Sequence, residues 1–197
     1  MEMIQAIETE FDGYRFRSRL EARWAVFMKE LGVKYEYEKE GYDLGELGWY
    51  LPDFWLPDHN CWLEIKGQMP TAEEQKSCEG LALGTTKVVY LSWSPIPSPE
   101  EITENGLELI YSYSPAIFMG KECQWIERSH AVWCYCPSCG VVGLAYNGNG
   151  IDLARQGLCK CISKRTVYLT FDAPRILRAY EQARMARFEQ GSFGYNN

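Results

Sequence analysis

The chain has 197 residues, of which 46% are hydrophobic, and this size fits one ordinary domain with a small addition. It contains neither an apolar run of about 18 residues nor a basic region followed by an apolar one at its start, so we expect no membrane span and no secretory signal. A cytoplasmic location is therefore expected. In that setting the eight cysteines favour metal binding or free thiols over disulfides.

The net charge of −7 is unevenly distributed. Residues 1–120 carry 10 Lys and Arg against 21 Asp and Glu, whereas residues 121–197 carry 10 against 6. This asymmetry indicates that the first part holds cations and that the second part meets phosphate. The alternative is that the acidic groups form a solvated face, and we adopt it for Glu36, Glu38 and Glu40.

A hairpin is predicted over residues 4–16. Asp12-Gly13 is a strong turn signal, and Tyr14 and Phe16 alternate after it. We expect this hairpin to precede the first helix directly.

The segment from Leu20 to Leu31 has the apolar spacing of a helix. Ser18 is suited to begin this helix as its N-cap, and Gly32 is placed to end it. Glu21 lies three residues after Ser18, which is the spacing of a capping box. Glu21 therefore has a structural role open to it, and this role is compatible with a second one in which Glu21 reaches a metal site from the helix.

Strand patterns follow the helix. Residues 33–38 alternate strictly and predict a half-buried strand, and residues 41–48 are expected to form a loop. The stretch 49–67 then contains two short apolar runs, Leu51–Leu56 and Cys61–Ile65, separated by a Pro-Asp-His-Asn turn, which predicts a second hairpin.

This second hairpin carries three charged groups of interest. Side chains alternate along a strand, so Glu64 and Lys66 share one face of the second run. Asp53 points away from the apolar side of the first run, so the hairpin can bring Asp53, Glu64 and Lys66 together. Charged groups in an apolar hairpin need a partner or a metal, because their burial is costly otherwise. The alternative is a surface hairpin in which Glu64 and Lys66 form a salt bridge.

A helix from Pro70 to about Leu83 is predicted next, and Thr71 and Glu74 fit a capping box. Residues 87–93 form a continuous apolar run, which is typical of a strand that is covered on both faces. The order is thus helix, three strands, helix, strand. Its last part is a βαβ-like crossover, so the sheet should be mixed.

Two further features precede the cysteine-rich part. Residues 94–99 are a proline-rich connector that suits neither a helix nor a central strand. An edge strand is expected over residues 107–112.

The order of elements, with Pro52-Asp53 and Glu64-x-Lys66, resembles the PD-(D/E)XK nuclease superfamily. The resemblance covers roughly residues 14–93 and implies an α/β fold with a restriction-endonuclease-like core of αβββαβ order. The chain is most similar to small phage and mobile-element nucleases, such as Holliday-junction-resolving endonucleases and transposon end-cleaving subunits.

The resemblance implies an Mg²⁺-dependent (or Mn²⁺-dependent) endonuclease that hydrolyses phosphodiester bonds in duplex or branched DNA with a metal-activated water. Asp53, Glu64 and the backbone carbonyl of Ile65 would ligate the metal. Glu21 would help to place a second metal or polarise the water. Lys66 would orient the water and stabilise the developing charge, and Gln68 would touch the substrate. Cutting both strands of a duplex would suit a homodimer.

Two other functions stay open. One is a catalytically silent nucleic-acid-binding or inhibitor protein that keeps the fold. Its usual sign is the loss of a carboxylate or of the lysine, and neither is lost here. The other is a zinc-stapled interaction module in which the motif is a coincidence.

A zinc-ribbon-like segment is predicted over residues 121–170. Two cysteine pairs, spaced C-x₂-C and C-x-C, lie on either side of an Asn-Gly turn, and tetrahedral zinc accepts four sulfurs at ~2.3 Å. The expected ligands are Cys136, Cys139, Cys159 and Cys161. The short second spacing leaves Cys134 and His130 as alternative ligands. Free structural cysteines and an iron–sulfur cluster are the other interpretations.

Basic residues in this segment and in a C-terminal helix, expected within residues 171–190, suit contacts with DNA phosphates. The candidates are Arg155, Lys160, Lys164, Arg165, Arg175 and Arg178. On the helix, Arg184 and Arg187 are expected to face outward as well. Residues 1–120 would then be the nuclease-like domain, and residues 191–197 a loose tail. The remaining cysteines, Cys61, Cys78 and Cys123, are expected to be packing residues.

Overall fold

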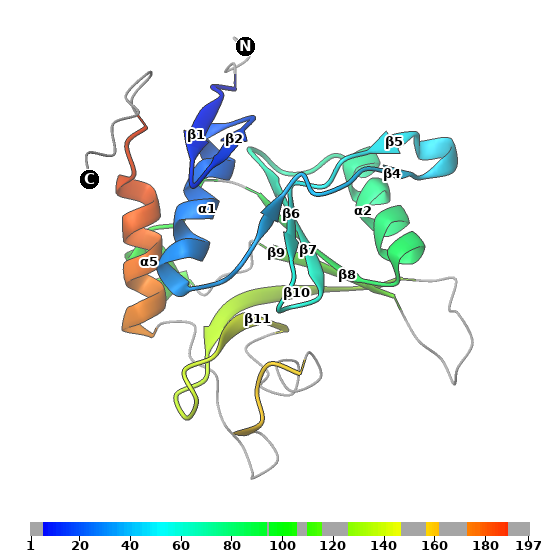
Figure 1. Ribbon diagram of the computed structural model, residues 1–197. Helices are drawn as coiled ribbons and strands as arrows, with labels where there is room; N and C mark the ends of the chain where they lie inside the picture. The colour runs from blue at the N-terminus through cyan, green and yellow to red at the C-terminus, as the bar shows by residue number, and fades with distance from the viewer. Residues whose placement is uncertain are drawn as a thin grey trace.

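The computed structural model of the protein describes residues 6–93, 95–105, 110–115, 126–146, 157–161 and 173–188. It is a mixed α/β structure built on a seven-stranded sheet (Figure 1). The order of strands in this sheet is β11-β10-β9-β8-β7-β6-β3. Their bounds are β3 Glu36–Tyr37, β6 Phe54–Leu56, β7 Cys61–Lys66, β8 Val88–Trp93, β9 Ile110–Pro115, β10 Ile126–Tyr135 and β11 Val142–Tyr146.

The sheet is mixed, as predicted, because β7 and β8 are parallel while the other neighbouring pairs are antiparallel. A parallel pair needs a crossover, and helix α2 (Ala72–Thr85) supplies it. The N-cap of α2 is Thr71, and the predicted capping box with Glu74 is present. The helix runs two residues past the expected end and closes at Thr86 in the left-handed region (φ 55°).

The N-terminal elements follow local signals in the sequence. The first hairpin pairs β1 (Thr9–Phe11) with β2 (Tyr14–Phe16) around the predicted turn. Helix α1 (Arg19–Leu31) begins at Ser18, whose side chain accepts a hydrogen bond from the Glu21 N–H. It ends at Gly32, whose φ of 71° suits a residue without a Cβ atom.

The region between α1 and the second hairpin differs from the prediction in two ways. The expected strand 33–38 is reduced to β3, because Glu38 turns the chain into the left-handed region (φ 46°) directly after it. The expected loop 41–48 contains β4 (Tyr42–Asp43) and a 3₁₀ turn, η1 (Gly45–Leu47). Strand β4 pairs with β5 (Trp49–Tyr50) in a separate two-stranded sheet.

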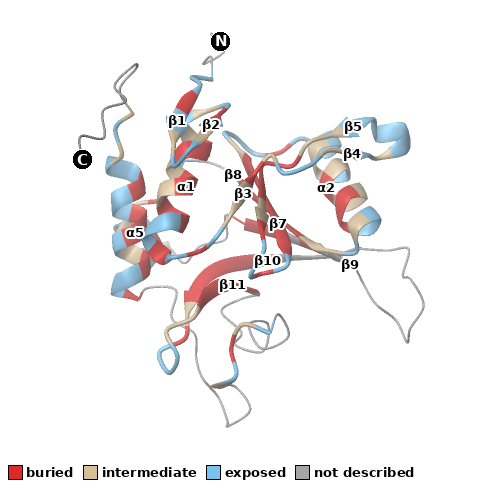
Figure 2. Ribbon diagram, viewed as in Figure 1, coloured by how far each residue is buried: buried red, intermediate tan, exposed pale blue. Residues whose placement is uncertain are grey.

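The second hairpin forms with Phe54 opposite Leu63 and Leu56 opposite Cys61. Its first strand, β6, begins at Phe54 and is therefore shorter than the expected run Leu51–Leu56, while Trp49 and Tyr50 pair with β4. Both faces of the hairpin are buried, and this differs from a surface hairpin (Figure 2).

Two layers of side chains cover the sheet. On one face, α1 and helix α5 (Pro174–Met185) enclose a core in which Phe27, Trp133 and Tyr180 pack edge to face or tilted. On the other face, α2 packs on a second cluster that includes Trp62 and Tyr113. Figure 1 shows α1 and α5 side by side, with α2 on the far side of β7.

The connection after β8 also departs from the prediction. The proline-rich connector leads into helix α3 (Pro99–Asn105), which the sequence analysis did not predict. Ser98 and Glu101 exchange hydrogen bonds at its start, as in a capping box. The strand predicted over residues 107–112 corresponds to β9. Its predicted position at an edge of the sheet is wrong, because β9 lies between β8 and β10.

The two strands of the cysteine-rich segment, β10 and β11, belong to the main sheet. The boundary expected near residue 120 therefore falls between neighbouring strands of one sheet, and α5 packs on α1. The expected loose tail, residues 191–197, lies outside the described residues. No helix in the described ranges is both long and apolar enough to cross a membrane.

Candidate functional site

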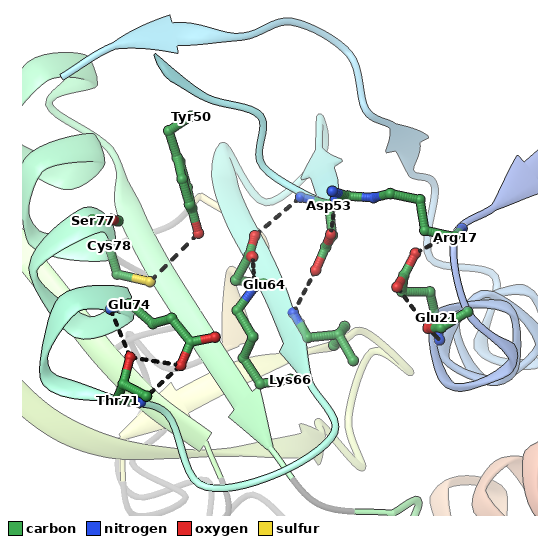
Figure 3. Close-up of polar contacts among 12 residues, drawn as sticks. Arg17, Glu21, Tyr50, Asp53, Glu64, Lys66, Thr71, Glu74, Ser77 and Cys78 are labelled. Atoms are coloured by element: carbon green, nitrogen blue, oxygen red, sulfur yellow. Dashed lines mark hydrogen bonds and ion pairs between the residues drawn. The ribbon is translucent and has the colours of Figure 1, made fainter. Parts of the chain in front are cut away.

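Two buried carboxylates lie at the start of the second hairpin. Asp53 precedes β6 and is 2% exposed, and Glu64 in the middle of β7 is 1% exposed. The ladder that pairs Phe54 with Leu63 places Asp53 beside Glu64 on the neighbouring strand. Each carboxylate also accepts a hydrogen bond from a backbone N–H. Asp53 Oδ2 accepts from the Ile65 N–H (2.8 Å), and Glu64 Oε2 accepts from the Asp53 N–H (3.1 Å). The backbone thus fixes both carboxylates (Figure 3).

Each carboxylate has a cationic partner. Lys66 Nζ donates to Glu64 Oε1 at 2.5 Å, and its side chain is 24% exposed. Arg17 Nη2 donates to Asp53 Oδ1 at 2.8 Å. The Nε of Arg17 also lies 2.7 Å from Glu38 Oε1, in an ion pair. Three carboxyl groups and two basic groups therefore meet at this end of the hairpin.

Glu21 does not share this cluster. Its carboxylate accepts hydrogen bonds from the Ser18 hydroxyl (2.6 Å), the Arg17 backbone N–H (3.1 Å) and the Tyr37 hydroxyl. Figure 3 shows Arg17 between Glu21 and Asp53. The predicted capping box is formed only in part: Ser18 caps the Glu21 N–H, but the Glu21 carboxylate accepts from the Arg17 N–H and not from the Ser18 N–H. The role of Glu21 at a metal stays a prediction.

The protonation of the site follows from burial and neighbouring charge. Burial raises the pKa of Asp53 well above its usual range, and the negative charge of Glu64 raises it further. Burial lowers the pKa of Lys66, but the charges of Glu64 and Asp53 more than offset this effect and raise it overall. Lys66 is therefore a cation at neutral pH.

Three residues at the site were missed by the sequence analysis. Arg17 and Tyr37 hold Asp53 and Glu21 as described above. Tyr50 points its hydroxyl toward Glu64 and Cys78 (3.9 Å to Cys78 Sγ), and burial followed by the charge of Glu64 raises the pKa of Tyr50 (Figure 3). No local signal in the sequence marks Arg17, because its partner Asp53 lies 36 residues away along the chain.

A second candidate site lies where β10 ends. Of all the Cys, His, Asp and Glu side chains in the described ranges, one group of three or more has ligand atoms within 4.8 Å of one another. Its members are Cys136, Cys139, Cys159 and Cys161. Glu21, Asp53 and Glu64 are not part of this group. These four cysteines are the ones expected from their spacing, and they could hold a metal ion.

The geometry of the four cysteines suits a tetrahedral ion. The sulfur of Cys159 lies 3.6 Å from the sulfurs of both Cys136 and Cys139. Ligands at ~2.3 Å from a tetrahedral zinc would be about 3.8 Å apart. A tight turn forms the first pair, with the Gly140 N–H donating to Cys136 O (2.8 Å) and Gly140 at φ 75°.

The alternative ligands lie elsewhere. Cys134 is buried and its thiol donates to Gly143 O, while the His130 ring packs on Tyr111 at 5.2 Å between centroids. Cys61 and Cys78 are buried free thiols, as expected for packing residues. Cys123 lies outside the described residues.

The predicted phosphate-binding residues differ in exposure and in their contacts with the protein. Lys160 is exposed beside the cysteines, and Arg178 is exposed on α5. Arg175 is engaged with the protein, since its guanidinium donates to Leu31 O at 2.8 Å and to Gly140 O at 3.4 Å. Arg155, Lys164 and Arg165 lie outside the described residues.

The remaining candidate polar residues are Arg184, Arg187 and Gln68. Arg184 donates to Ile96 O, and both Arg187 and Gln68 are exposed.

Comparison of the chain with protein-family models, with curated proteins and with solved structures gives no match.

Proposed function

We propose that this protein is a metal-dependent endonuclease that hydrolyses phosphodiester bonds in DNA. The observation that carries the proposal is the pair of buried carboxylates, Asp53 and Glu64, held on adjacent strands with Lys66 beside them. A buried ionic cluster is weak evidence of a stabilising role, because the cost of removing charges from water often exceeds their mutual attraction. A catalytic role explains why the chain retains such a cluster.

The donor set fits a hard divalent cation. Asp53, Glu64 and the carbonyl of Ile65 offer oxygen ligands, which Mg²⁺ and Mn²⁺ prefer. Burial and, after it, the charge of Glu64 raise the pKa of Asp53, and a bound cation would favour the carboxylate form. When bound, such an ion supplies charge neutralisation at the phosphate and an acidified water.

Lys66 contributes by its charge. Because its pKa is raised, the ammonium does not accept a proton at neutral pH, and it serves to orient water and to stabilise the negative charge that develops on the phosphoryl oxygens. In the hydrolysis, water forms the new P–O bond, the bond to the leaving oxygen breaks, and the proton lost by the water is balanced by one gained on the leaving oxygen.

We propose further that the four cysteines hold Zn²⁺ and that this ion is structural. Soft thiolate ligands select zinc over magnesium, and four protein ligands leave no open position for catalysis. The exposed Lys160 and Arg178 are the described residues best suited to contact the DNA backbone.

The test is cleavage of supercoiled, linear and branched DNA with and without Mg²⁺, with single-stranded and duplex RNA as comparison substrates. Asp53→Asn and Lys66→Met should each lower the rate by about 10²-fold or more, because each removes a group that acts in the transition state. Lys76→Met, on the exposed face of α2, is the matched control and should cut as wild type. A Lys66→Met protein that cuts like wild type would refute the proposal.

A further inference from the structure

Arg17 is the one cation of the site with two carboxylate partners and a half-exposed side chain. The side chain of Arg17 is 53% exposed, although Asp53, to which it donates, is buried. The carboxylate of Asp53 has both oxygens engaged, Oδ2 by the Ile65 N–H and Oδ1 by Arg17. The first of these bonds is made by the backbone inside the sheet. Arg17 is therefore the partner of Asp53 that can leave.

A second anchor holds Arg17 over the site. The Nε of Arg17 pairs with Glu38, which has a left-handed backbone (φ 46°) that is unusual for a residue with a Cβ atom. The Glu38 N–H donates to Asp53 O at 2.8 Å, which keeps Glu38 next to Asp53. Backbone strain of this kind persists where the surrounding structure fixes it, and it is found most often at functional sites.

We propose that Arg17 occupies, in the free protein, the place on Asp53 that a divalent cation takes in the working site, and that it moves to a substrate phosphate when the ion binds. The inference rests on the proposed nuclease function. A cation already paired with Asp53 has to be displaced, so the apparent affinity for the ion is the intrinsic affinity multiplied by the fraction of molecules in which Arg17 has left Asp53. Once displaced, a guanidinium next to the site is well suited to bind a phosphate with two parallel hydrogen bonds.

The direct contact of Arg17 with Glu21 does not involve the Arg17 side chain. The contact between Arg17 and Glu21 is made by the Arg17 backbone N–H, which every substitution except proline retains. Arg17→Gln therefore removes the cation over Asp53 and leaves the helix cap in place. Arg19→Gln is the matched control, because it removes the same charge from an exposed position two residues away.

The first measurement is the binding of Mn²⁺ alone, without DNA, followed by the loss of the free-ion signal in electron paramagnetic resonance. Arg17→Gln should bind Mn²⁺ about threefold to tenfold more tightly than wild type, since a charge-assisted hydrogen bond no longer competes. Arg19→Gln should bind within about twofold of wild type, as expected for an exposed charge that solvent and salt screen. Arg17→Lys, which keeps the charge but cannot contact two carboxylates as a fork, should lie between wild type and Arg17→Gln.

The second measurement is DNA cleavage at saturating Mn²⁺. Arg17→Gln should raise KM for DNA about fivefold or more, because a phosphate contact is lost. Tighter metal binding together with weaker DNA binding is not expected of a residue that merely supports the fold. If Arg17→Gln does not fold, which its circular dichroism spectrum and melting curve would reveal, the same two measurements on Arg17→Lys decide the matter.

Two results overturn the inference in different ways. If wild type binds Mn²⁺ and cuts DNA, but Arg17→Gln binds Mn²⁺ no more tightly, Arg17 is not the stand-in for the ion, and the proposed nuclease function stands. If wild type neither binds Mn²⁺ nor cuts any substrate, the nuclease proposal fails and takes this inference with it.

Discussion

Arg175 gives the sharpest test of how the cysteine-rich segment is attached to the rest of the protein. Its guanidinium donates to the carbonyl of Leu31 at the C-terminal end of α1 and to the carbonyl of Gly140 beside the cysteines. A cation at this end of a helix also meets the negative end of its dipole. We therefore expect Arg175→Ala to lower the stability of the protein, although the sequence suggested a role in DNA binding.

The expected size of the effect follows from these contacts. A hydrogen bond to a charged group contributes roughly 1.5–3 kcal/mol when buried, and exposure of Arg175 reduces this to about 1 kcal/mol. For a domain of this length, 1 kcal/mol corresponds to a change in Tm of about 2–4 °C. Differential scanning calorimetry at equal protein concentration measures this change.

Arg178 is the natural control, since it lies one turn further along the same helix and is exposed. Arg178→Ala should leave Tm within about 1 °C of wild type, as is usual for surface substitutions. If Arg175→Ala leaves Tm unchanged and weakens DNA binding as much as Arg178→Ala does, the structural role assigned to Arg175 is wrong.

Three further predictions concern the core, the cysteines and pH. Leu63→Ala should lower the free energy of unfolding by about 2–5 kcal/mol in urea titration, because Leu63 is fully buried in β7; a loss below 1 kcal/mol would contradict the core described here. A strong zinc chelator should lower Tm and release one equivalent of zinc per chain from wild type. Cys136→Ser should retain no zinc, whereas the control Cys78→Ser should retain it. Loss of zinc from Cys78→Ser, or its retention by Cys136→Ser, would contradict this ligand set. Burial lowers the pKa of His59, which binds Val142 O through Nε2 at 3.1 Å, below the value of the unfolded chain. Stability should therefore fall as the pH drops from about 6.5 toward the folded pKa, and His59→Gln should remove that part of the pH dependence; an unchanged pH profile in denaturant melts would argue against it.

Local signals in the sequence predicted local structure well. Ser18 and Gly32 bound α1, Asp12-Gly13 forms the first turn, and the Thr71–Glu74 capping box begins α2. In each case the decisive contact lies within four residues along the chain, so the residue types alone fix it. The pair Ser98 and Glu101 is a signal of the same kind that the prolines beside it concealed.

Features that depend on distant pairing could not be predicted in this way. An apolar run does not reveal whether it lies at the edge of a sheet, and β9 is internal because β10 pairs with it. Trp49 and Tyr50 lie outside the second hairpin because they pair with β4. The site shows the same division: the alternation within β7 predicted that Glu64 and Lys66 share a face, but the contact of Arg17 with Asp53 spans 36 residues and has no local signature.

The packing of α5 on α1 has a consequence for synthesis on the ribosome. The contact between Arg175 and Leu31 joins residues 144 positions apart, and Tyr180 covers Trp24 and Phe27 in the same layer. These aromatic rings are translated early, and their cover is translated late. At a translation rate of about 5–20 residues per second, the apolar face of α1 therefore stays exposed for on the order of ten seconds before α5 is synthesised. A nascent chain of this protein is expected to bind ribosome-associated chaperones until α5 has left the exit tunnel.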